Sequence, residues 1–173
     1  MLRRVLDALY DAAGHLAALF MVGTLAMVLA GIVSRLEGVY FRGSDAYAGY
    51  SMAAAGFLAL AYTFKHGEHI RVNLVLERLQ GRARRAMEIL ALVLATLAGA
   101  LLAFYSVRLA WQSYVIHDVS QAVDATPLWI PQIAMAAGSV LLLVALADDL
   151  LARLAGREPA RLRRTAVEAS RVE

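Results

Sequence analysis

Four long stretches without a charged side chain constrain the fold of this chain more than any other feature of its sequence. They extend over residues 12–34, 46–64, 89–107 and 125–147. At about 1.5 Å per residue, roughly 19 helical residues cover about 28 Å, which matches the ~30 Å hydrocarbon core of a bilayer. Only helices and closed barrels satisfy every backbone group in lipid, and these stretches lack the alternation of barrel strands. The sequence therefore predicts an all-α integral membrane protein with four transmembrane helices.

The composition agrees with this prediction, because 61% of the 173 residues are hydrophobic, more than a water-soluble core requires. The chain has no cysteine, which excludes disulfides, thiolate nucleophiles and cysteine-bound metal clusters. The first stretch is long for a signal peptide and is not followed by a clear A-x-A cleavage site, so we take it as a retained span. We expect one membrane domain over residues 1–155 and a basic cytoplasmic tail over residues 156–173.

The positive charges are distributed very unevenly between the two ends of the predicted spans. With four spans, the amino end, the second loop and the carboxyl tail lie on the same side of the membrane. All of the 17 Lys and Arg residues lie there except Arg35, Arg42 and Arg108. Because positive residues are enriched in cytoplasmic loops, this distribution predicts that both termini are in the cytoplasm.

The second loop has the pattern of an additional helix over residues 70–87. Apolar residues recur there at helical spacing, whereas the opposite side is charged. Such a helix lies in the membrane interface, where its cations contact anionic lipid headgroups. The sequence therefore predicts an interfacial amphipathic helix between the second and third spans, with Arg78, Arg82, Arg84 and Arg85 at the lipid interface.

The four stretches are poor in groups that bind or move ions. His15 is their only histidine, acidic or basic side chain. A carrier or channel normally places ionisable groups at membrane depth, because their cost there is tolerated only for function. The spans carry small residues at helical spacing instead, such as Ala95, Gly99 and Ala103, which let helices approach closely. This pattern favours packing against other helices, including those of a partner membrane protein, over transport by the chain alone.

Two histidines, His66 and His69, follow the second stretch, with Gly67 and Glu68 between them. A metal site needs several converging ligands, the H-E-x-x-H pattern is absent, and His117 is expected on the other side of the membrane. We therefore predict a structural junction at this point. The sequence predicts no catalytic residue, no metal site and no cofactor.

Two elements of the sequence resemble those of a known family. The first is Gly67-Glu68-His69-Ile70-Arg71-Val72, which lies between the second span and the basic interfacial helix. The second is Thr126-Pro127-Leu128-Trp129-Ile130-Pro131, at the start of the fourth span. With the four-span pattern, they are similar to the small membrane subunit of tripartite ATP-independent periplasmic (TRAP) transporters, the DctQ-like family. The resemblance extends over nearly the whole chain, and the glycine-histidine element is its most specific part.

This resemblance implies a subunit without enzymatic activity in the bacterial inner membrane. The implied partners are a large permease subunit, a periplasmic solute-binding protein and membrane lipids, with no nucleic acid. Uptake of an organic acid or similar solute would be driven by an ion gradient, and the large subunit would hold the substrate and ion sites. The small subunit would then be a scaffold for the large one.

Polar residues of the two predicted outer loops are candidates for contact with the binding protein, although ordinary solvated loop charges explain them equally well. These residues are Arg35, Arg42, Asp45, Asp118 and Asp124. Two other functions remain open at this point. One is an autonomous small four-helix exporter, which would need a carboxylate within a span. The other is a membrane anchor of a redox complex.

Overall fold

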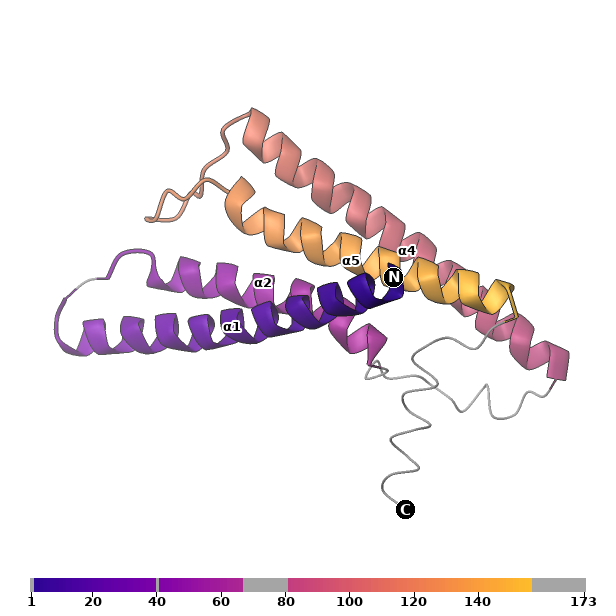
Figure 1. The fold of residues 1–173 in the computed structure, drawn as a ribbon. Helices are drawn as coiled ribbons and strands as arrows, with labels where there is room; N and C mark the ends of the chain where they lie inside the picture. Colours follow the sequence, from indigo (N-terminus) through magenta and orange to yellow (C-terminus); the bar gives the residue numbers. More distant parts are fainter. Residues whose placement is uncertain (1, 40, 67–80, 157–173) are drawn as a thin grey trace, which may run out of the picture.

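The computed structural model describes residues 2–39, 41–66 and 81–156, and this part of the chain folds into four α-helices (Figure 1). The helices are α1 (Leu2–Leu36), α2 (Ser44–Lys65), α4 (Gly81–Val115) and α5 (Trp129–Leu154). No strand occurs within these ranges, where the only β-type pairing is an isolated bridge between Val119 and Pro127. The predicted all-α class is therefore confirmed.

Three of the helices are long and apolar enough to cross a membrane: α1 over Val5–Leu36, α4 over Ala83–Val115 and α5 over Trp129–Leu154. Helix α2 has 22 residues and is rich in alanine, glycine and tyrosine. It is not among the three candidate spans. The fourth span thus remains a prediction.

The four helices form a row in which each contacts its neighbours in the order α1, α2, α5, α4. Figure 1 shows two helical hairpins, α1 with α2 and α4 with α5, that meet where α2 contacts α5. We call the end where α1 and α4 begin the terminus end. The opposite end, where residues 37–43 and 116–128 connect the helices, is the loop end. The row places α1 and α4 at its two edges.

The helix boundaries differ from the predicted ones at the charged residues. Helix α4 begins at Gly81, so Arg82, Arg84 and Arg85 belong to its first turns and not to a separate interfacial helix over residues 70–87. Residues 70–80 of that predicted helix lie outside the described residues. The physical reason is that arginine, alanine, methionine and glutamate are all good helix formers, so nothing in this segment ends a helix.

The contact between α2 and α5 is so close that the backbones of the two helices touch. A Cβ atom at Gly138 of α5 would lie 2.5 Å from the carbonyl carbon of Phe57 and 2.9 Å from the backbone nitrogen of Leu58. Such distances are too short for real atoms, so only glycine fits at this point. Gly138 therefore fixes how near the two hairpins approach each other.

Helices α4 and α5 are joined by a small polar contact within their apolar interface. The hydroxyl groups of Ser106 and Ser139 lie 3.3 Å apart, and both residues are buried. The Ser139 hydroxyl donates to the carbonyl oxygen of Met135 in its own helix. Because every buried polar atom needs a partner, this pair satisfies both hydroxyls without opening a path for solvent.

Candidate functional site

The terminus end of the row contains a buried ion pair between the two hairpins. Lys65, the last residue of α2, lies 3.1 Å from the Asp148 carboxylate of α5. The Lys65 side chain is only 7% exposed and the Asp148 side chain 27%. The Lys65 ammonium also lies 5.3 Å from the centre of the Tyr10 ring of α1, which permits a cation–π contact. Lys65 therefore contacts three of the four helices, counting its own.

Two further contacts at the same end hold the outer helices, an imidazole–carboxylate contact for α1 and an ion pair for α4. In the α1–α2 contact, His66 Nε2 lies 4.0 Å from the Asp11 carboxylate. In the α4–α5 contact, Arg153 pairs with Glu88, which also accepts a hydrogen bond from Arg84 at 3.2 Å. Each neighbouring pair of helices in the row is thus linked near the terminus end, by an ion pair in two cases and by the imidazole–carboxylate contact in the third.

A small apolar cluster packs beside these pairs, buried between three of the helices. Buried residues from α1, α2 and α5 meet there: Tyr10, Ala61, Phe64, Ala145 and Leu146. Asp149, directly after Asp148, is also buried, with 1% exposure. This site was not predicted from the sequence, because charged residues were considered only as the ends of the predicted spans. The adjacent acids at the end of the fourth stretch were the available signal.

At the loop end, Asp124 holds the connection between α4 and α5 against the start of α2. Its carboxylate accepts hydrogen bonds from the Tyr50 hydroxyl at 3.1 Å, the Ser120 hydroxyl at 3.0 Å and the Thr126 backbone N–H at 3.3 Å. The Thr126 hydroxyl in turn bonds the Tyr47 hydroxyl at 3.4 Å. The Asp124 carboxylate therefore has hydrogen-bond partners within the chain itself.

Gly43, just before α2, allows this close approach of the connection. Its φ angle is +81°, in the left-handed region that favours glycine. A Cβ at this position would also come within 2.9 Å of the Asp124 Cβ. The turn before α2 and the connection after α4 thus pack together through a residue without a side chain.

Hydrogen bonding holds the pKa of Asp124 below its ordinary value of 3.8. Thr126 makes the largest contribution, Ser120 and Tyr50 add to it, and desolvation opposes it. A carboxyl group with a lowered folded-state pKa stabilises the fold above its ordinary pKa, and this stabilisation is lost as the pH falls through the folded-state pKa.

We therefore expect wild-type protein to lose more thermal stability than Asp124→Asn protein when the pH is lowered from about 5 to about 3. The asparagine variant has no carboxyl group to protonate at this position. Melting temperatures of both proteins in detergent, measured across this range, check the prediction. Asp118→Asn, in the same connection, is the matched control, because the Asp118 side chain accepts none of these hydrogen bonds. Parallel pH profiles for wild type and Asp124→Asn would contradict it.

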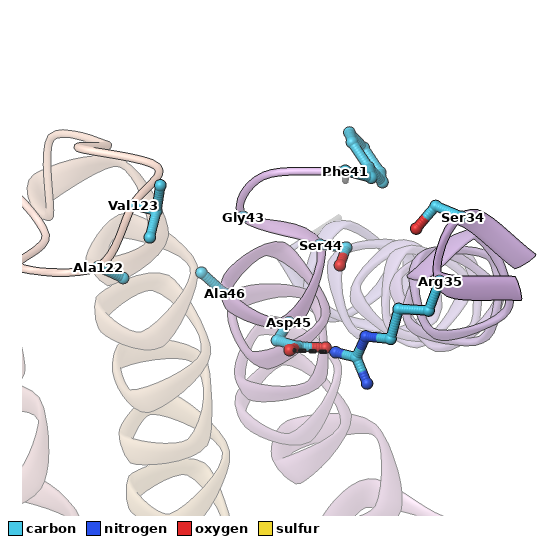
Figure 2. A pocket seen from close by; sticks show the side chains of 9 residues that line it. All are labelled: Ser34, Arg35, Phe41, Gly43, Ser44, Asp45, Ala46, Ala122 and Val123. Carbon is cyan, nitrogen blue, oxygen red and sulfur yellow. Dashed lines mark hydrogen bonds and ion pairs between the residues drawn. The ribbon is translucent and has the colours of Figure 1, made fainter. Parts of the chain in front are cut away.

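Beside this network, Arg35 and Asp45 form an exposed ion pair at a pocket of about 210 Å³. Figure 2 shows the Arg35 guanidinium of α1 reaching the Asp45 carboxylate of α2, at 2.7 Å. Their side chains are 63% and 82% exposed, respectively. Of the five predicted loop contacts, these two and Arg42 are exposed, whereas Asp118 and Asp124 are half-buried in the connection.

The second family element bridges the connection and the first turn of α5. Thr126 accepts a backbone hydrogen bond from Ser120 through its carbonyl oxygen, and Pro127 takes part in the isolated bridge. The Trp129 ring packs edge-on against Tyr114, with centroids 5.7 Å apart, and Pro131 lies in the first turn of α5. The first element, with Gly67, His69, Ile70, Arg71 and Val72, lies outside the described residues, as does Arg78.

The described ranges contain no group of three or more histidine, cysteine or acidic residues that could hold a metal ion. His15 bonds the carbonyl oxygen of Asp11 in its own helix, at 2.7 Å, and is exposed. His117 is likewise exposed and bonds the carbonyl oxygen of Tyr114 at 2.8 Å. Each of these two histidines thus bonds a carbonyl oxygen three or four residues earlier in the chain.

Long apolar helices in two hairpins, with charged pairs confined to their ends, define a multi-pass membrane protein. The family model for tripartite ATP-independent periplasmic transporters, DctQ component, matches residues 24–156 of the chain. The chain therefore belongs to the DctQ family, the small membrane subunits of TRAP transporters, and is a transporter component. The comparison with curated proteins gave no match.

Proposed function

We propose that this chain scaffolds the large permease subunit of a TRAP transporter. In this role it supports ion-gradient-driven uptake of an organic acid or similar solute, delivered by a periplasmic binding protein. The observation that carries the proposal is the set of side-chain contacts between helices at the terminus end, two of which are ion pairs. Lys65–Asp148, His66–Asp11 and Arg153–Glu88 each link two neighbouring helices. Because every helix–helix contact in the row has such a link, the four helices would stay in one arrangement while the large subunit moves.

Four hydroxyl groups inside the helices support a role without conduction. Thr24 and Thr96 donate to carbonyl oxygens one turn earlier in their own helices, at 2.9 and 2.7 Å. Ser106 and Ser139 bond each other. Among the described residues, these four hydroxyls are therefore satisfied within the chain and are not available as ligands for a solute or ion. We propose that the substrate and ion sites lie in the large subunit.

We further propose that all four helices span the inner membrane, with the terminus end in the cytoplasm. Helix α2, at 22 residues, would extend about 33 Å and lies between α1 and α5, so its length matches the bilayer core. The distribution of arginine and lysine supports this orientation. Arg84 and Arg85, both exposed in the first turns of α4, would then meet cytoplasmic headgroups, as we propose for Arg78 and Arg82.

In this orientation the loop end faces the periplasm. Arg35, Arg42 and Asp45 are exposed there and are the contacts that we propose for the binding protein. Asp118 and Asp124 are half-buried there and belong to the same proposed contact surface. The Asp124 carboxylate also accepts three hydrogen bonds within the chain, so it shapes this surface as well.

Purification of the tagged full-length chain from native membranes tests the scaffold role. We expect it to bring down a large multi-spanning permease subunit, and the purified chain alone to move no solute into proteoliposomes. Flux by the chain alone would favour an autonomous exporter. A visible absorbance spectrum in the purified complex would favour a redox anchor. Either result, or the absence of a large permease, would contradict the proposal.

A further inference from the structure

An open apolar groove lies between α4 and α5, in the half of the row nearer the loop end. It has a volume of about 480 Å³. Its walls are almost entirely hydrocarbon and come from two helices. The residues that form them are Ala100, Ala103, Phe104 and Val107 of α4 with Val140 and Leu143 of α5.

One cation lies at the edge of this groove. Arg108 of α4 lines it together with Trp111. Arg108 is exposed, and no carboxylate of the described residues lies within ion-pair distance of it. The sequence analysis placed Arg108 in an outer loop, but α4 continues to Val115, about 10 Å further along the helix axis. Arg108 is therefore a cation on a helix that we propose to span the membrane, near the end of that helix at the membrane interface.

The surroundings of Arg108 match the level of lipid headgroups. Trp111 is 68% exposed and its ring lies 6.2 Å from that of Tyr114. Tryptophan and tyrosine gather at this depth because their rings are apolar and their polar atoms reach water or headgroups. The other loop-end cations are placed differently, since Arg35 is paired with Asp45 and Arg42 lies before α2.

We propose that this groove binds one phospholipid, with its phosphate on Arg108 and an acyl chain along the apolar wall. From Arg108 back to Ala100 the helix covers about 12 Å, enough to hold the upper part of one acyl chain. A guanidinium forms strong charge-assisted hydrogen bonds to phosphate oxygens, and this pairing satisfies a charge that lipid tails alone would leave unsolvated. The groove thus has one anion-binding edge and one hydrocarbon wall, as a phospholipid requires. If a helix of a partner protein covered the groove instead, it would have to supply a carboxylate at the depth of Arg108 to pair with its charge.

The test uses the purified full-length chain in detergent and native mass spectrometry with three lipids that have the same acyl chains. They are phosphatidylglycerol, phosphatidylethanolamine and diacylglycerol, which lacks the phosphate. We expect one copy of either phospholipid to bind roughly tenfold more tightly than diacylglycerol, the effect of one charge-assisted hydrogen bond. A preference between the two phospholipids would show whether net negative charge adds to the phosphate contact.

Two variants separate the headgroup contact from the acyl contact. Arg108→Gln should remove the difference between phospholipid and diacylglycerol, whereas Ala100→Leu should fill the groove and weaken all three lipids by a similar factor. Arg42→Gln, which changes an arginine outside the groove, is the matched control and should leave binding unchanged. A phospholipid with a photoreactive acyl chain should crosslink to residues 100–111 in the wild type.

The proposal fails if Arg108→Gln retains the preference for phospholipid, or if Arg42→Gln reduces it equally. It also fails if, in native membranes, the photoreactive lipid labels none of residues 100–111 and a crosslinker at Val107 reaches another protein instead. That last result would identify the groove as a subunit contact. Both variants should keep the melting temperature of the wild type within a few degrees, which separates lost binding from lost folding.

Discussion

Lys65→Met protein is expected to lose on the order of 3 kcal/mol of its free energy of unfolding. Breaking a buried ion pair by removing one partner leaves an uncompensated charge, here that of Asp148. The estimate lies at the lower end for buried pairs, because the Asp148 side chain retains 27% exposure. Methionine keeps the length and the apolar stem of lysine, so the loss reports the charge. Denaturant unfolding of the full-length chain in detergent measures it.

The matched control is Arg35→Gln, which breaks the exposed ion pair with Asp45. Both side chains of that pair are mostly solvent-accessible, at 63% and 82%. Exposed pairs contribute little, so we expect a change below about 0.5 kcal/mol. Removing both charges, in Lys65→Met with Asp148→Asn, should recover a large part of the loss. Equal losses for Lys65→Met and Arg35→Gln would show that the buried pair does not hold the two hairpins together.

Gly138→Leu is expected to abolish the native contact between α2 and α5. Even the first side-chain carbon at this position would lie 2.5 Å from the Phe57 carbonyl carbon. Backbone atoms cannot move aside as a flexible side chain can, so the two hairpins must separate. Overpacking of a core typically costs about 1–3 kcal/mol, and a backbone clash belongs at or above the upper end of that range. Loss of monodisperse protein in size-exclusion chromatography, and of the co-purified large subunit, measures the effect.

Gly56→Ala is the control for this second prediction. Gly56 lies on the same helix as Phe57, but an added Cβ there meets no atom within 4 Å. Because alanine favours helices over glycine by roughly 1 kcal/mol, this change should be neutral or slightly stabilising. The effect of Gly138→Ala on the yield of monodisperse protein should lie between those of Gly138→Leu and Gly56→Ala. If Gly138→Leu protein were purified intact with its partner, the contact at Phe57 would not define the arrangement of the hairpins.

The helical class and the family followed from patterns that depend on local chemistry alone. Long uncharged stretches such as residues 12–34 have to form backbone hydrogen bonds within themselves in lipid, and the structure confirms helices there. The motif from Thr126 to Pro131 supported the family, and the family match confirms it. Neither inference required knowledge of which helices touch.

Charged residues were harder to place, because a charge does not itself end a helix. Arg108 was taken as the end of the third span, yet α4 continues to Val115. Lys65 comes directly after the second predicted span, but it is buried against Asp148. Asp124 was a candidate contact for the binding protein, and the structure adds that its carboxylate accepts hydrogen bonds from Tyr50 and Ser120. The partner groups of Lys65 and Asp124 are distant in the sequence or belong to a tight turn.

The sequence by itself determined that this chain is a helical membrane protein of the DctQ family, because hydrophobic length and short motifs act within one helix or one turn. Only the tertiary structure decided the order of the helices in the row. It also decided the pairing of Lys65 with Asp148 and the position of Arg108 beside an apolar groove. These features depend on which surfaces approach each other across α2, α4 and α5. That choice is made by close contacts such as Gly138 against Phe57, which no local pattern encodes.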